Sequence, residues 1–117
     1  MRVLVLLLLS AFPLQAQQSC EVELVLAMDV SRSVDPNEFN LIRHGTAEAF
    51  RNPEILELID WMPDGVLVTV TQWSGAQQQR QVIPWHLLSN AEQVRDFADA
   101  IDAMKRTFRY DLTAPGE

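Results

Sequence analysis

The pattern of apolar and polar positions along the chain predicts three strands. Residues 22–28 become continuously apolar, which is typical of a parallel strand covered on both faces. Residues 66–73 alternate and are rich in β-branched side chains, and a Pro-Asp-Gly turn at 63–65 precedes them. Residues 81–85 suit a short third strand, which Pro84 restricts to an edge or an end of the sheet. We therefore expect a small sheet.

A helix is predicted after the first strand. Asp35 can cap it, Pro36 suits its first position, and Glu38 completes a capping box three residues after the cap. The apolar residues at helical spacing, which we expect on its buried face, are Phe39, Ile42, Ala47 and Phe50. The charged residues that we expect to point toward water are Arg43, Glu48 and Arg51.

Two more helices follow from the same signals. A short one restarts at Asn52-Pro53 and carries Ile55, Leu56 and Ile59. Another begins at a capping box formed by Ser89 and Glu92 and reaches about Arg106. The apolar residues of its buried face are Val94, Phe97, Ile101 and Met104. The order is β-α-β-β-α, with the short helix not counted separately, and it indicates the α/β class.

We expect both ends of the chain to lie outside this fold. Residues 1–16 resemble a secretory signal peptide, with Arg2 before an apolar stretch and a small-residue cleavage site at 14–16. The apolar stretch is shorter than the roughly 20 residues of a membrane span, so no stable membrane insertion is expected after cleavage. Residues 107–117 lack periodicity and form an irregular tail. Residues 17–117 would then be one small domain in the bacterial periplasm or outside the cell.

The charge balance and the single cysteine narrow the range of partners. The chain has 16 acidic and 9 basic residues and a net charge of −7, which argues against binding to nucleic acid or to anionic membranes. Cys20 is the one cysteine, so an internal disulfide is excluded. Lipid attachment at Cys20 and an uncleaved membrane anchor are the alternatives to a cleaved signal peptide.

The candidate chemistry lies directly after the first strand, where Asp29, Ser31 and Ser33 occupy alternate positions. Mg²⁺ prefers oxygen ligands and keeps several of its waters, which leaves positions open for a partner's carboxylate. The carboxyl ends of parallel strands are also where α/β sheets place ligand sites. The alternative is a plain turn in which Ser31 and Ser33 hydrogen-bond backbone amides.

These residues resemble the von Willebrand factor type A (vWA) family. The Asp-x-Ser-x-Ser motif at 29–33 is similar to the start of its metal-ion-dependent adhesion site, and residues 66–73 with Ser74-Gly75 are similar to its second strand and following serine. The segments that further resemble an uncharacterised group of exported bacterial proteins with such a domain are 24–35, 51–54 and 73–75. The resemblance covers most of residues 20–106. It implies a partial doubly wound, Rossmann-like fold that corresponds to the N-terminal half of a vWA domain.

The resemblance also implies roles for individual residues. Ser31 and Ser33 would contact the cation directly, and Asp29 would act through water. The family adds a threonine, for which Thr113 is the matching position and Thr107 a substitute, and a later aspartate that has no counterpart here. The cation would be Mg²⁺, with Mn²⁺ or Ca²⁺ as alternatives. The partner would be a protein that offers a carboxylate.

The leading hypothesis is therefore an exported, non-enzymatic, vWA-like protein-binding module. Phosphohydrolases of the haloacid dehalogenase type also place an aspartate after a buried strand, but their second aspartate is replaced here by Ser31, which cannot serve as the acid. No nucleophile elbow or phosphate-binding loop is present in the sequence. A truncated, non-functional family member is the other alternative. The residues that we expect to be structural or at the surface are Arg32, His44 and His86, and those in the core or at its rim are Trp61, Trp73 and Trp85.

Overall fold

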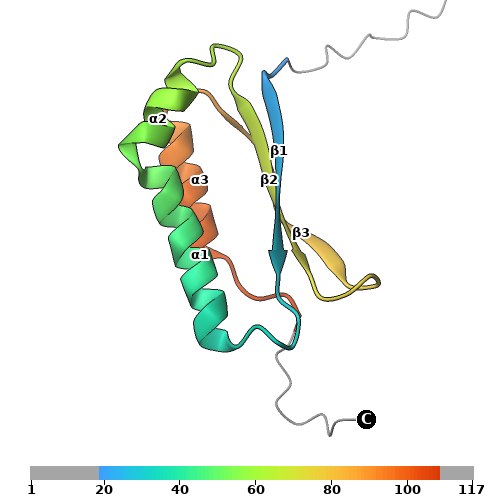
Figure 1. Ribbon diagram of the computed structural model, residues 1–117. Helices are drawn as coiled ribbons and strands as arrows, with labels where there is room; N and C mark the ends of the chain where they lie inside the picture. Colours follow the sequence, from blue (N-terminus) through green and yellow to red (C-terminus); the bar gives the residue numbers. More distant parts are fainter. Residues whose placement is uncertain (1–18, 109–117) are drawn as a thin grey trace, which may run out of the picture.

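The computed structural model describes residues 19–108, which form one sheet with helices against one of its faces (Figure 1). The strands are β1 (Val22–Asp29), β2 (Val66–Trp73) and β3 (Gln79–Leu88). The helices are α1 (Pro36–Arg51), α2 (Pro53–Asp60) and α3 (Ala91–Ala103). The order β-α-α-β-β-α confirms the α/β class, and the short helix after Asn52 is a separate element.

The sheet has the order β1-β2-β3, and its pairing aligns the carboxyl ends of the first two strands. β1 runs parallel to β2, with Val22 opposite Val66 and Asp29 opposite Trp73. β3 runs antiparallel to β2 and is longer than predicted. Pro84 lies on this edge strand, as predicted, at a place where the register with β2 shifts. The parallel register brings the polar residues after β1 beside the turn that follows β2.

The prediction that the first strand is covered on both faces was wrong for the described residues. β1 pairs on one side only, and Val25 is 54% exposed. The three helices lie together on one side of the sheet (Figure 1). An apolar run shows that a strand can be buried, but it cannot show whether covering elements are present. One covered face is in keeping with a partial doubly wound fold.

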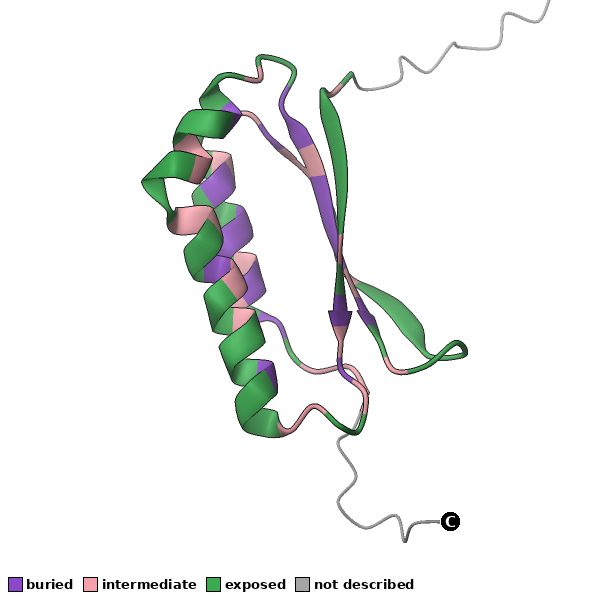
Figure 2. Cartoon of the chain, viewed as in Figure 1, coloured by how far each residue is buried: buried purple, intermediate pink, exposed green. Residues whose placement is uncertain are grey.

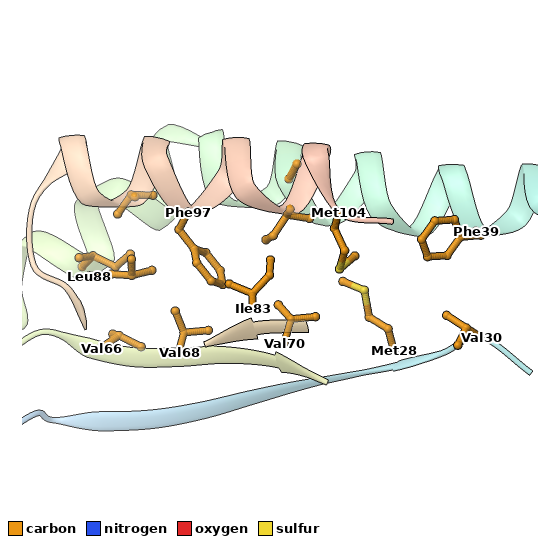
Figure 3. Packing of buried hydrophobic residues seen from close by; sticks show 14 residues of the cluster. Met28, Val30, Phe39, Val66, Val68, Val70, Ile83, Leu88, Phe97 and Met104 are labelled. Atoms are coloured by element: carbon orange, nitrogen blue, oxygen red, sulfur yellow. The ribbon is translucent and has the colours of Figure 1, made fainter. Parts of the chain in front are cut away.

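The core lies between α3 and the sheet, and α1 packs beside α3 (Figures 2 and 3). Phe97 points from α3 toward the sheet and is fully buried, and its ring meets that of Phe50 edge to face at 5.0 Å. The other fully buried apolar residues predicted on this helix are Val94 and Ile101. The apolar face of α3 was therefore identified correctly from its spacing.

The ends of the helices were predicted with mixed success. Asp35 caps α1 as expected, since its carboxylate accepts hydrogen bonds from the amides of Asn37 and Glu38 at 2.7 and 2.9 Å. The cap of α3 is Asn90 and not Ser89, because the Asn90 side chain accepts from the amide of Gln93 at 2.9 Å. α3 also ends at Ala103, before the predicted Arg106.

Glu48 is exposed as predicted, but the other two charged residues of α1 that were expected to point toward water are not. Arg43 and Arg51 are half-buried at the contact between α1 and α3 instead of pointing into water. The Arg43 guanidinium donates to the backbone carbonyl of Asp102 on α3. None of the three tryptophans lies in the core, and Trp61 is 76% exposed. Helical spacing locates an apolar face, but long arginine side chains also reach across the edges of that face.

Candidate metal site at the end of β1

The loop of residues 30–34 joins β1 to α1 and is held by backbone and side-chain hydrogen bonds. The buried Val30 donates its amide to the carbonyl of Trp73 at 2.9 Å, which ties the loop to the end of β2. The carboxylate of Asp29 accepts the amide of Ser31 at 2.7 Å, and the amide of Val34 donates to the carbonyl of Ser31 at 3.0 Å. The loop is therefore a tight turn in which a carboxylate binds the backbone.

The two serine hydroxyls lie next to each other in this turn. Ser31 Oγ and Ser33 Oγ are 3.3 Å apart, and the side chain of Ser31 also hydrogen-bonds Asp29. In an octahedral Mg²⁺ site, bonds of roughly 2.1 Å place neighbouring ligands about 3 Å apart. The two hydroxyls are thus spaced so that one small cation can contact both.

The Asp29 carboxyl group is favoured in its ionised form. Hydrogen bonds from Ser31 lower the pKa of Asp29 below its ordinary value; the bond from the Ser31 side chain has the larger effect and the bond from its amide the smaller. The positive charge of Arg106 lowers this pKa further. The carboxylate therefore stays charged at neutral pH. The cluster offers one anionic group and two neutral hydroxyls, a donor set of hard oxygens that suits Mg²⁺, Mn²⁺ or Ca²⁺.

An open hollow of about 700 Å³ lies beside the loop. Its lining comes from the loop after β1, the turn between β2 and β3, and the segment after α3, and consists of Ser31, Arg32, Ser74, Gly75, Gln78, Thr107 and Phe108. The structure therefore brings Thr107 into the same hollow as Ser31. Thr113, the first choice for the threonine, lies outside the described residues. Asp29, Ser31 and Ser33 lie together as the sequence predicts.

Two residues that support this site were not predicted from the sequence. Gln72 on β2 is fully buried, and its side chain accepts from the amide of Thr107 at 2.7 Å and donates to the carbonyl of Lys105 at 2.9 Å. Arg106 donates to carbonyls of the loop after β1. A glutamine on the inward side of an apolar strand is the signal that would have located Gln72, because a buried amide needs partners.

A second polar cluster lies between α1 and α3. The ligand atoms of His44, Glu48 and Asp102 lie within 4.8 Å of one another, which is a spacing that a metal ion accepts. Arg51 already occupies this cluster, since its guanidinium pairs with Glu48 and Asp102 at 2.7 Å each and with Asp99 at 2.6 Å. The hydrogen bond from Arg51 is the main cause that lowers the pKa of Asp102. The cluster is therefore an ion-pair network with its own cation.

Comparisons with known proteins place the chain in one family. Among residues 19–108, no helix has both the length and the apolar character needed to cross a membrane. Neither the search of curated proteins nor the search of solved structures found a match. A family model described as a protein of unknown function (DUF1194) matches residues 19–117. Since this match covers most of the sequence, the chain belongs to the DUF1194 family.

Proposed function

We propose that this protein is an exported, vWA-like binding module that holds a partner protein through a divalent cation. The cation, Mg²⁺ in the first instance, binds at Asp29, Ser31 and Ser33. The observation that carries the proposal is the pair of serine hydroxyls 3.3 Å apart beside an ionised carboxylate, at the carboxyl end of a parallel strand. Mn²⁺ and Ca²⁺ take the same oxygen ligands and are the alternatives.

The donor set explains why a partner is needed. Two neutral hydroxyls and one carboxylate neutralise only part of the charge of a divalent cation, so the ion keeps a strong attraction for a further anionic ligand. A glutamate or aspartate of the partner completes its shell. Ser31 and Ser33 bind directly, Asp29 acts through water, and Thr107 takes the part first assigned to Thr113, because it lies in the hollow beside Ser31.

The surroundings of the hollow favour a protein carboxylate over other partners. Arg32 lines the hollow next to Ser31 and is exposed, so a carboxylate that enters the hollow has a cationic residue nearby. The chain as a whole has a net charge of −7, which disfavours nucleic acid. The cation and Arg32 together offset this negative charge locally. The position of Ser31, where a hydrolase of the dehalogenase type needs a second aspartate, supports binding without catalysis.

Calorimetric titration of the purified chain with MgCl₂ and MnCl₂ tests the proposal. We expect one ion per chain, and a loss of affinity of roughly tenfold or more in both Asp29→Ala and Ser31→Ala. Thr46→Ala is the matched control, because Thr46 is a hydroxyl residue of α1 that donates to the carbonyl of Ile42, away from the site. A folded wild-type chain that binds neither ion would refute the proposal.

A further inference from the structure

Arg106 bonds the loop of the proposed site at three points. Its Nη2 atom donates to the carbonyls of Val30 at 2.6 Å and Ser31 at 2.9 Å, and its Nη1 atom donates to the carbonyl of Val34 at 2.7 Å. The guanidinium also lies over the ring of Phe39, 6.0 Å from its centre. Only a planar, forked donor reaches several carbonyls at once in this way, and a lysine ammonium does not reproduce the geometry.

The backbone on either side of Arg106 is itself held to the sheet. The side chain of Gln72 bonds the carbonyl of Lys105 and the amide of Thr107, the two neighbours of Arg106 in sequence. Gln72 itself is fully buried, so its side-chain amide needs these two partners. Arg106 therefore extends from a point fixed on β2 to the loop that follows β1, and it joins segments that are about 75 residues apart in sequence.

The positive charge of Arg106 opposes the binding of a cation at the proposed site. A guanidinium beside a cation site repels the cation, so its charge alone weakens metal binding. The hydrogen bonds of this guanidinium to the loop go to backbone carbonyls, and the carboxylate of Asp29 is bonded chiefly by Ser31. The carbonyls of Val30, Ser31 and Val34 are drawn toward Arg106, while the hydroxyl of Ser31 lines the hollow.

We infer that Arg106 is a positioning residue, which fixes the loop of residues 30–34 so that the hydroxyls of Ser31 and Ser33 are held together for the cation. It touches no ligand itself. This role rests on the proposed metal site and adds to it a residue that acts through the loop backbone. The cost of its positive charge is outweighed by the order that its three hydrogen bonds impose on the loop.

Two substitutions separate the geometry of Arg106 from its charge. Arg106→Lys keeps the charge and loses the fork, and Arg106→Met loses both. Arg95→Lys, at an exposed position of α3, is the matched control. The first measurement is amide hydrogen exchange without metal. We expect exchange at residues 31–34 to be roughly tenfold faster in both variants and unchanged in the middle of α1 and in β2.

The second measurement is Mg²⁺ affinity at low and at high salt. We expect roughly tenfold weaker binding in Arg106→Lys, by the same factor at both salt concentrations. Arg106→Met should also bind more weakly than the wild type, but by a smaller factor at low salt, because it also removes the repelling charge. An effect of charge alone predicts the opposite, namely tighter binding in Arg106→Met and a difference that shrinks as salt screens it. A general loss of stability would instead raise exchange throughout the core, which the protected amides of β2 would report.

The outcomes distinguish the two proposals. If the wild-type chain binds no Mg²⁺, the proposed function is wrong, and the exchange rates alone then decide the positioning role. Faster exchange confined to residues 31–34 supports that role, and exchange equal to the wild type in Arg106→Lys and Arg106→Met overturns it. Tighter Mg²⁺ binding by Arg106→Met also overturns it. Should Arg106→Met not fold, Arg106→Lys carries both measurements.

Discussion

The loop after β1 and the ion-pair network between α1 and α3 both combine carboxylates with an arginine, but the two arginines bond different groups. Arg51 donates to the carboxylates of Glu48, Asp99 and Asp102, so their charge is already neutralised. Arg106 donates to three backbone carbonyls of the loop, and the carboxylate of Asp29 accepts from the amide of Ser31. Under the proposed function, the groups to which each arginine donates decide which of the two clusters takes a metal cation.

A count of acidic residues alone would select the network and not the proposed site. The network holds more carboxylates than the loop and adds His44, yet its guanidinium competes with any incoming cation. The loop offers one carboxylate and two uncharged hydroxyls, and Ser31 lines the hollow. A divalent cation would have to displace Arg51 from the network, so our proposal assigns the cation to the loop, although the loop holds fewer carboxylates.

The largest effect that separates the two regions is expected from Gln72→Leu. The change leaves the part-buried amide of Thr107 and carbonyl of Lys105 without the side chain of Gln72, so the free energy of unfolding should fall by about 1–3 kcal/mol. It should also weaken Mg²⁺ binding, while the pKa of Asp102 in the network is unchanged. Urea denaturation and calorimetry measure the two effects, with the exposed Gln77→Leu as control. Full stability of Gln72→Leu would contradict the account.

A smaller effect is expected from Arg51→Met, which removes the cation of the network. The carboxylates of Glu48, Asp99 and Asp102 then repel one another, so the melting temperature should fall by a few degrees. The same variant should gain a site for Zn²⁺ at His44, Glu48 and Asp102, seen as a rise in melting temperature when Zn²⁺ is added. Arg95→Met is the control. An equal rise for the wild type would show that Arg51 does not block the network.

The smallest effects concern the pKa values of one aspartate in each region. Ser31→Ala should raise the pKa of Asp29 toward its ordinary value and leave that of Asp102 alone, and Arg51→Met should do the reverse. NMR titration of the carboxyl carbons measures both. A single variant that moves both values would show that the two regions are coupled.

The lowered pKa values of Asp29 and Asp102 determine how the stability of the fold changes with pH. Both folded-state pKa values lie below the ordinary value of 3.8, so the stability that these carboxylates contribute is present above that pH. It is lost as the pH falls through the lowered values. Asp102→Asn should therefore make stability less sensitive to acid, as thermal melts between pH 2 and about pH 5 would record.

Local sequence signals predicted much of the fold and the position of Asp29, Ser31 and Ser33 after the first strand. The cap of α1 at Asp35 depends on residues three apart, and the position of Asp29 and Ser31 depends only on where β1 ends. Contacts between distant segments were missed. Arg106 donates to the loop after β1, and Arg51 donates to Asp102 on α3. Both contacts depend on how α3 packs against α1 and the sheet, and the sequence pattern of a single helix or strand does not contain this information.

The most direct test of the account is where a paramagnetic cation binds. Mn²⁺ added in small amounts to the isotope-labelled chain broadens the NMR signals of nearby nuclei. We predict that the amide signals of residues 31–34 and Thr107 disappear first, and that Ser31→Ala abolishes this effect. The account is contradicted if the signals of His44, Glu48 and Asp102 disappear first, because the cation would then prefer the network that Arg51 neutralises.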